Sequence, residues 1–147
     1  MQIQEVNILI ADDDPDDRLM IRDAFEENHL GTSLFFVENG EELLYFLYNK
    51  GKYSSAKDYP RPGLILMDLN MPIIDGREAL REIKSNDQLR SIPVIVLSTS
   101  EADEDICRTY SLGVNSFITK PVSFSSLVDT IRTFAQYWLN IVALPHS

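Results

Sequence analysis

The stretch LILMDLNMPIIDG, residues 64–76, decides the fold of this chain. It begins with four apolar residues, Leu64–Met67, and such a continuous run is typical of a strand that is buried on both faces, as in a parallel sheet. Asp68 follows directly, and Asn70 and Pro72 come next, which are residue types common in turns. The stretch therefore predicts a buried strand that ends in an acidic turn.

Similar apolar runs recur along the chain and alternate with helical patterns. Five strands that alternate with five helices predict an α/β fold, a doubly wound five-stranded parallel sheet. Right-handed crossovers narrow the possible topologies, and among these we expect the flavodoxin-like strand order 2-1-3-4-5. The expected strands are Val6–Ala11, Leu34–Val37, Leu64–Met67, Val94–Leu97 and Ser116–Thr119. The expected helices are Asp16–Glu27, Glu41–Asn49, Arg77–Lys84, Asp103–Ser111 and a last one from Ser123 onward.

Length and composition fit one globular domain without a membrane span. The chain has 147 residues, of which 44% are hydrophobic and 24% are charged, enough apolar side chains for a single core. Its apolar runs are far shorter than the roughly 20 residues of a membrane-spanning helix. The single cysteine, Cys107, cannot form an internal disulfide, and the N-terminus shows no secretory pattern, so we expect a cytoplasmic protein. A net charge of −10 argues against binding to nucleic acid.

The segment Lys50–Gly63, KGKYSSAKDYPRPG, has Gly and Pro breaks, mixed charge and little periodicity, and we expect a long loop there. Loops of this length are often functional or mobile. A long surface insertion also costs little closure entropy. The role of the segment therefore stays open between a functional loop and a tolerated insertion.

Polar side chains stand at the ends of four expected strands. In an open α/β sheet, ligands bind outside the carboxyl ends of the strands. Carboxylates, a hydroxyl and an ammonium group gathered at one edge predict a site for a hard cation and a phosphoryl group. The first strand ends in Asp12-Asp13-Asp14, the third in Asp68, the fourth in Ser98-Thr99 and the fifth in Lys120-Pro121.

The chemistry of these groups predicts a role for each. Asp13 and Asp68, with Asp12 nearby, supply the oxygen ligands that Mg²⁺ prefers, and waters complete its shell. The Asp68 carboxylate can attack phosphorus and form an aspartyl-phosphate. The cation and Lys120 would neutralise the phosphoryl oxygens, and Ser98 would donate a hydrogen bond to the phosphoryl group.

Each residue also has a purely structural interpretation. The run Asp12–Asp17 can be an acidic helix start in which Pro15 takes the first helical position. Asp68 can be a turn or cap residue, Ser98 an ordinary strand-end hydroxyl, and Lys120 the partner of a buried carboxylate. Because all of them fall at the same edge of one sheet, the functional interpretation is favoured.

Four blocks of the sequence, ILIADDDPDD, LILMDLNMPIIDG, VIVLSTS and FITKP, resemble the signature blocks of response-regulator receiver domains, the CheY-like phosphoacceptors of two-component phosphorelay signalling. The resemblance runs from about Asn7 to Phe134. It implies a Mg²⁺- or Mn²⁺-dependent protein that a sensor histidine kinase phosphorylates, with no enzymatic activity beyond self-phosphorylation and self-dephosphorylation. The implied roles are Asp68 as phosphoacceptor, Asp12, Asp13 and the backbone carbonyl of Asn70 as metal ligands, Ser98, Thr99 and Phe117 as switch positions, Lys120 as phosphoryl contact, and a cis bond before Pro121.

A narrower resemblance concerns the partner. The Lys50–Gly63 segment and the ending FAQYWLNIVALP look like the receivers that serve cyanobacterial and other bacterial phytochrome kinases. Two other classes stay as alternatives. A phosphohydrolase of the haloacid-dehalogenase type needs a second carboxylate two residues after its nucleophile, where this chain has Asn70. A phosphorylation-independent interaction module would have no use for the acceptor, the acidic pair and Lys120.

The end of the chain carries an apolar stripe that is longer than one domain needs. We expect a receiver domain over residues 1–134 and a C-terminal extension over residues 135–147, where Leu139 and Leu144 have little core left to enter. Large exposed apolar patches usually mark interaction sites, so the stripe predicts a homodimer, with a fold-back onto the same domain or a different partner as alternatives. The candidate dimer residues are Leu127, Ile131, Phe134, Trp138, Ile141 and Val142.

Overall fold

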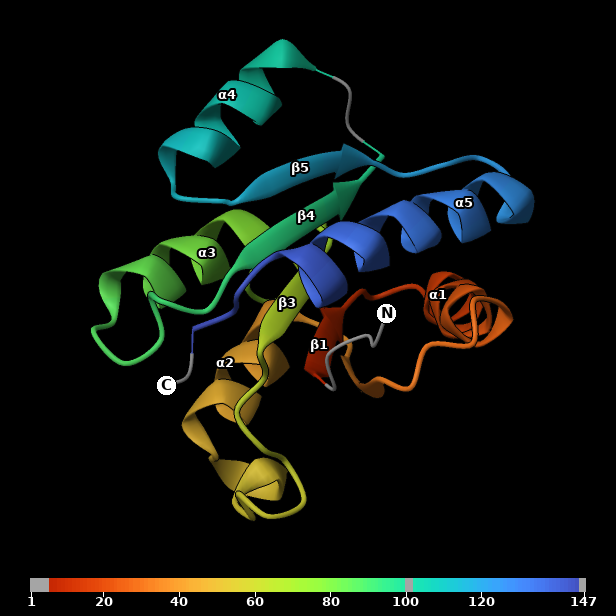
Figure 1. The fold of residues 1–147 in the computed structure, drawn as a ribbon. Coiled ribbons are helices and arrows are strands. Elements are labelled where there is room, and N and C mark those ends of the chain that lie inside the picture. Colours follow the sequence, from red (N-terminus) through yellow and green to blue (C-terminus); the bar gives the residue numbers. More distant parts are fainter. Residues whose placement is uncertain (1–5, 100–101, 146–147) are drawn as a thin grey trace.

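The structure is a computed structural model, and it describes residues 6–99 and 102–145. In these residues, five parallel strands form one sheet in the order β2-β1-β3-β4-β5, which confirms the flavodoxin-like, CheY-like arrangement (Figure 1). The strands are found within one residue of their predicted ends. They are β1 (Asn7–Ala11), β2 (Ser33–Val37), β3 (Leu64–Met67), β4 (Val94–Ser98) and β5 (Ser116–Thr119).

Helices cover both faces of the sheet. α1 and α5 pack against each other on one face, α2 and α3 pack on the other, and α4 lies against β5 (Figure 1). An ion pair of 3.1 Å between Arg77 and Asp105 links α3 to α4. None of the helices in the described ranges is both long and apolar enough to cross a membrane. The helices are α1 (Pro15–Glu27), α2 (Gly40–Tyr48), α3 (Gly76–Ser85), α4 (Asp103–Ser111) and α5 (Phe124–Ala135).

The central strands are apolar at every position because both of their faces are buried. In β3, Ile65 and Met67 belong to the core under α2 and α3, whereas Leu64 and Leu66 belong to the core under α1 and α5. All four are at most 2% exposed. Successive side chains of a strand point to opposite faces, so a strand with a helical layer on each side needs apolar residues throughout.

Capping side chains set the starts of four helices. The side chain of Asp14 accepts a hydrogen bond from Asp16 N, and those of Asn39, Asp75 and Ser123 each accept one from the backbone N–H three residues later. Such caps satisfy backbone donors that have no partner within the helix. They explain why the helix starts lie so close to the predicted ones.

The long Lys50–Gly63 segment is held against the core. It contains a short 3₁₀ helix, η1 (Gly51–Tyr53). The side-chain amide of Asn49 donates to the carbonyls of Tyr53 and Tyr59 at 3.0 and 2.9 Å, and the Tyr53 and Tyr59 rings contact each other and Phe46. The Tyr53 hydroxyl donates to Glu42 at 2.5 Å, and burial together with this carboxylate raises the pKa of Tyr53 to about 12.

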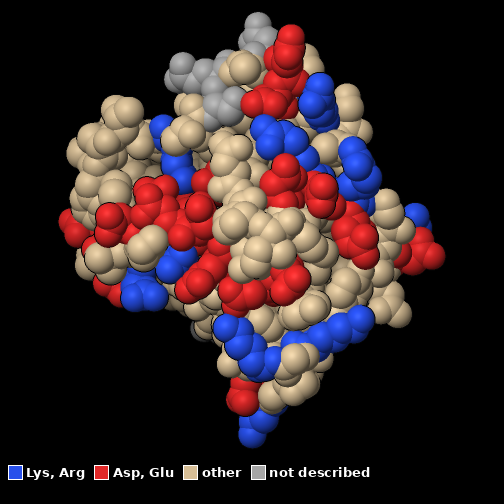
Figure 2. All heavy atoms as spheres, turned by 180° about the vertical axis from the view of Figure 1, so that it is seen from behind, with Lys and Arg blue, Asp and Glu red and all other residues tan. Residues whose placement is uncertain are grey.

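The same segment carries a local excess of positive charge. Its cations are Lys50, Lys52, Lys57 and Arg61, against the one carboxylate of Asp58. Figure 1 places this segment at the lower end of the molecule, and Lys and Arg side chains gather at the same end in Figure 2. Acidic side chains dominate the middle of the view in Figure 2.

The chain after α5 folds back onto its own domain, which corrects part of the dimer prediction. The helical segment η2 (Gln136–Ile141) continues α5 with wider π-type turns. Leu139 is fully buried and Leu144 is 9% exposed, in the same core as Val6. The tail thus covers apolar residues at the start of the sheet, since Leu64, the first residue of β3, belongs to this core as well.

Three of the candidate dimer residues are likewise part of the core. Leu127, Ile131 and Phe134 are at most 5% exposed, so they offer little surface to a second copy of the folded domain. Ile141 remains 69% exposed, and Trp138 and Val142 are partly buried. The expected boundary between residues 134 and 135 therefore does not separate two packing units, and the outer ends of the two ranges, residues 1–5 and 146–147, lie outside the described residues.

Candidate functional site

The parallel register brings four strand ends to one edge of the sheet. Ala11 at the end of β1 pairs with Met67 at the end of β3, and Ser98 of β4 pairs with Thr119 of β5. Backbone hydrogen bonds continue just beyond the strands, because Asp68 N donates to the Ala11 carbonyl at 2.9 Å and Lys120 N donates to the Ser98 carbonyl at 2.7 Å. The side chains that follow the strands are thus placed by the sheet itself.

The ammonium group of Lys120 joins the acidic side chains at this edge. Its Nζ lies 2.8 Å from Asp12 Oδ2, 3.1 Å from Asp68 Oδ2 and 2.7 Å from Asp17 Oδ2. The side chains of Lys120, Asp12 and Asp68 are only 10%, 2% and 11% exposed. Charges that leave water need partners, and here one cation is shared among three carboxylates.

Burial and these contacts shift the pKa values of two groups. Burial raises the pKa of Asp12 above its usual range, and the hydrogen bond from Lys120 offsets part of that rise. Burial alone would lower the pKa of Lys120, but its hydrogen bonds to Asp12 and Asp17 outweigh that effect and raise it. Lys120 is therefore a cation throughout the neutral range, as electrostatic stabilisation of a phosphoryl group requires.

Asp12, Asp13 and Asp68 form a group that can hold a divalent cation. One carboxylate oxygen of each lies within 4.8 Å of the others. Asp12 is buried and Asp13 is exposed, so the group reaches from the interior to the solvent. A set of carboxylate oxygens with access to water suits Mg²⁺ or Mn²⁺, because Mg²⁺ keeps several of its waters and Mn²⁺ also favours oxygen ligands.

The acidic run Asp12–Asp17 combines the structural and the functional interpretations. Asp14 is the N-cap of α1 and accepts a hydrogen bond from Asp16 N at 2.8 Å. Asp12 faces the site, and its Oδ1 accepts a hydrogen bond from Asp14 N at 3.0 Å. Asp17 turns back from the first turn of α1 to the ammonium group described above. The sequence did not single out Asp17, and its place in the run was the one available signal.

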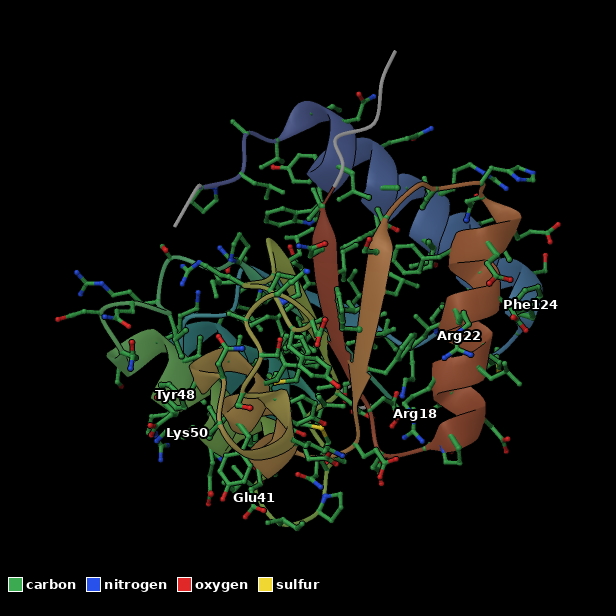
Figure 3. The ribbon with its side chains drawn as sticks, turned by 90° about the horizontal axis from the view of Figure 1, so that it is seen from below. Arg18, Arg22, Glu41, Tyr48, Lys50 and Phe124 are labelled. Atoms are coloured by element: carbon green, nitrogen blue, oxygen red, sulfur yellow. The ribbon has the colours of Figure 1, made fainter. Side chains whose placement is uncertain are left out.

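Two arginines hold α1 against the sheet next to the site. Arg18 and Arg22 extend from α1 toward β2 (Figure 3). Arg18 Nη1 donates to the Asp12 carbonyl at 2.8 Å, and the Arg22 guanidinium lies 5.0 Å from the centre of the Phe36 ring. The first of these contacts fixes the backbone at the end of β1, where the acidic group begins.

A glycine lets α3 start directly beside the Asp68 turn. Asn70 N donates to Asp68 Oδ1 at 3.3 Å, and Gly76 N donates to the Leu69 carbonyl at 2.8 Å. A Cβ atom on Gly76 would lie 2.5 Å from the Asp68 carbonyl oxygen and 2.7 Å from Leu69 Cα. These contacts are too close for any side chain, so the turn that carries Asp68 depends on glycine at this position.

The expected switch residues lie around the ends of β4 and β5. Ser98 is fully buried, Thr99 is exposed, and Phe117 is partly buried against the core under α2 and α3. Phe117 N donates to the Tyr110 hydroxyl at 3.1 Å, which links β5 to α4. Tyr110 is 48% exposed, and no motif in the sequence pointed to this contact.

The expected cis bond before Pro121 is not found. All peptide bonds in the described residues are trans, and the bond between Lys120 and Pro121 is among them. The tertiary amide before a proline still favours the trans isomer by about 0.5–1 kcal/mol, so residue type alone does not select cis.

Comparisons with known proteins place this fold and site in a family. The response regulator receiver domain matches residues 8–132. Response regulator Rcp1 of Synechocystis sp. is 36% identical over 138 residues, which cover 94% of this chain and 92% of Rcp1. The Mn²⁺-bound form of Rcp1 gives a TM-score of 0.86 at 35% identity, and covers 96% of this chain and 99% of that chain.

Two further solved structures are similar over nearly the whole chain. Response regulator RPA3017 in red light signaling of R. palustris gives a TM-score of 0.91 at 34% identity, and covers 96% of this chain and 99% of that chain. The phosphorylated cyanobacterial phytochrome response regulator RcpA gives a TM-score of 0.89 at 38% identity, and the match covers 97% of this chain and 99% of the RcpA chain. Because the family match extends from β1 through most of α5, the chain belongs to the response regulator receiver domain family.

Proposed function

We propose that this chain is a two-component response regulator that accepts a phosphoryl group from a sensor histidine kinase on Asp68, with Mg²⁺ or Mn²⁺ in the acidic group. The position of Asp68 carries the proposal. Its Oδ2 lies 3.1 Å from Lys120 Nζ, and one of its oxygens lies within 4.8 Å of ligand atoms of Asp12 and Asp13. The nucleophile, a cation and the metal ligands thus meet at one point.

Transfer would form a bond from a carboxylate oxygen of Asp68 to phosphorus, while the bond from phosphorus to the histidine nitrogen of the kinase breaks. A bound divalent cation supplies positive charge to the phosphoryl oxygens. Lys120 supplies a second positive charge, Ser98 would donate a hydrogen bond to the phosphoryl group, and the backbone carbonyl of Asn70 would join the metal ligands. Repacking of Phe117 would then carry the change to α4.

Incubation with Mg²⁺ and acetyl phosphate tests this function directly. The expected result is a mass increase of one phosphoryl group, which is absent when EDTA removes the metal. Peptide mapping should place the group on Asp68. An unmodified protein with phosphodonor and Mg²⁺ present would contradict the proposal.

An apolar surface beside the site supports a protein as the phosphodonor. Leu19 of α1 is 52% exposed, Phe124 at the start of α5 is 39% exposed, and Val122 is fully exposed. The helices α1 and α5 pack together, and Figure 3 places Phe124 at the N-terminal end of α5, next to α1. Exposed apolar residues on two neighbouring helices suit helices of a partner protein.

We further propose that the donor is a phytochrome kinase of the cytoplasm. The support is the similarity to Rcp1 and RcpA and the free, exposed thiol of Cys107, which suits a reducing compartment. Phosphotransfer from a purified bacterial phytochrome kinase should be faster than from an unrelated histidine kinase. Equal rates from both kinases would contradict the phytochrome assignment.

Phe124→Ala tests the apolar surface. It should slow phosphotransfer from the kinase and leave labelling by acetyl phosphate unchanged.

Asp13→Asn is expected to weaken Mg²⁺ binding about tenfold, because it removes one of few charged ligands from a site that otherwise uses water. Mg²⁺ titration followed by NMR or calorimetry measures the affinity. Asp16→Asn is the matched control, since it removes the same charge from an exposed position of α1. An Asp13→Asn protein that binds Mg²⁺ like the control would contradict the ligand assignment.

We also propose a homodimer through the exposed side of η2. Tyr137 is 53% exposed and lines a mainly apolar hollow of about 440 Å³, and Ile141, four residues later in η2, is 69% exposed. A second copy is favoured as occupant because symmetric pairing lets the same side chains fill the same hollow on both copies. The hollow is lined by Ile118, Asp129, Thr130, Thr133, Phe134, Tyr137 and Trp138.

Ile141→Asp is expected to weaken this association at least about tenfold, because it replaces an exposed apolar side chain of η2 with a charge. Light scattering over a range of concentrations, with and without acetyl phosphate, measures it. Val122→Asp is the control, since Val122 is also an exposed aliphatic residue but lies before α5. Deleting η2 is unsuitable because the deletion also removes Leu139 from the core. A wild-type chain that stays monomeric throughout would contradict the dimer.

A further inference from the structure

One carboxylate at the site has no part in metal binding or phosphoryl acceptance as described so far. Asp17 Oδ2 lies 2.7 Å from Lys120 Nζ, closer than either Asp12 or Asp68. It comes from the first turn of α1, whose start is set by Pro15 and the Asp14 cap. A rigid helix start therefore presents Asp17 to a lysine that follows the fifth strand.

The three contacts of Lys120 use its whole donor capacity. An ammonium group has three N–H donors, and here each donor has one carboxylate oxygen within reach. The Asp12 oxygen is itself held in place, because the other oxygen of that carboxylate accepts a hydrogen bond from Asp14 N at 3.0 Å. Asp12 and Asp17 thus fix two directions of the ammonium group, and these two leave the third N–H directed at Asp68.

Phosphorylation of Asp68 would change only the third direction. When Asp68 carries a phosphoryl group, the N–H that pointed at its carboxylate can turn to a phosphoryl oxygen, while the contacts to Asp12 and Asp17 remain. We propose that Asp17 is a positioning residue of the phosphoryl-transfer site, which together with Asp12 orients Lys120 toward the acceptor. This inference rests on the proposed function of Asp68.

Two variants separate positioning from other effects of Asp17. Asp17→Asn keeps an oxygen that can accept the hydrogen bond from Lys120, whereas Asp17→Ala removes it. A hollow of about 20 Å³ beside Asp17 and Lys120 has room for about one water. In Asp17→Ala such a water could accept the hydrogen bond from Lys120, but the helix would not hold it in place as it holds the Asp17 side chain. Asp16→Ala, one residue earlier and exposed, controls for the loss of an acidic side chain near the start of α1.

The test is the rate of phosphorylation by acetyl phosphate in saturating Mg²⁺, with Mg²⁺ affinity measured beside it. Asp17→Ala is expected to react about tenfold more slowly, because small misplacements of a catalytic group cost up to about 10²-fold. Asp17→Asn should recover most of the rate, and Asp16→Ala should match the wild type. Mg²⁺ affinity should change less than about twofold in all of them, since Asp17 lies outside the metal group.

Several results would overturn the inference. They are an Asp17→Ala rate equal to the wild type, an Asp17→Asn rate as low as that of Asp17→Ala, or a rate loss that follows a loss of Mg²⁺ affinity. NMR of the Lys120 ammonium gives an independent reading without phosphorylation: its protons should exchange slowly in the wild type and in Asp17→Asn, and fast in Asp17→Ala. Slow exchange in Asp17→Ala would overturn the positioning role, whereas an unmodified wild type would overturn the proposed function alone.

Discussion

Asp68→Asn is expected to abolish phosphorylation, with a loss of rate of more than about 10³-fold. The amide has nearly the shape of the carboxylate, but it is a far weaker nucleophile and cannot form the same acyl-phosphate. Acetyl phosphate in the presence of Mg²⁺, followed by intact mass, measures the loss. The phosphotransfer from a histidine kinase should disappear in parallel.

The fold should survive this substitution. Asn can still accept a hydrogen bond from Lys120, and the change removes one negative charge from a crowded acidic group, which includes the buried Asp12. We therefore expect the free energy of unfolding without metal to stay within about 1 kcal/mol of the wild type. Asp75→Asn is a useful control because Asp75 lies in the same signature block but caps α3. Phosphorylation of the Asp68→Asn protein at the wild-type rate would place the acceptor on another residue.

The order of the elements could be predicted because this fold imposes strict local demands. A strand such as β3 is buried on both sides and must be apolar at each position, and helices such as α1 begin at capping residues such as Asp14. The meeting of Asp12, Asp68 and Lys120 also followed from the sequence, since residues just after parallel strands share one edge of the sheet.

Contacts that depend on how far a single side chain reaches could not be predicted from the sequence. The hydrogen bond from Lys120 to Asp17 joins residues 103 positions apart and requires a known angle between α1 and β5. The contact of Phe117 N with the Tyr110 hydroxyl is of the same kind. The isomer of the peptide bond between Lys120 and Pro121 could not be predicted either, because a peptide bond before proline can be cis or trans.

The surface that the tail packs against stayed open for a related reason. An apolar stripe shows that a helix needs a partner, but the stripe alone does not distinguish the surface of its own domain from that of a second chain. Leu139 enters the core while Ile141, two residues later, stays exposed, because residues two positions apart on a helix do not share a face.

Leu139→Ala is accordingly expected to destabilise the protein by about 3 kcal/mol, within the range of about 2–5 kcal/mol for large-to-small changes of buried leucine. Leu139 is fully buried in the core that also contains Val6 and Leu64. The loss combines the transfer of apolar surface with the cavity that the shorter side chain leaves. Urea unfolding at several protein concentrations measures it and separates folding from self-association.

Ile141→Ala provides the matched control, because it removes a similar amount of apolar side chain from the same helical segment at a position that is 69% exposed. In the monomer it should change the free energy of unfolding by less than about 0.5 kcal/mol. The two substitutions thus affect different quantities: Leu139→Ala lowers the stability of the monomer, and Ile141→Ala weakens only association. Equal stability of the two variants at low protein concentration would show that η2 does not contribute to the core and that its apolar residues serve a partner instead.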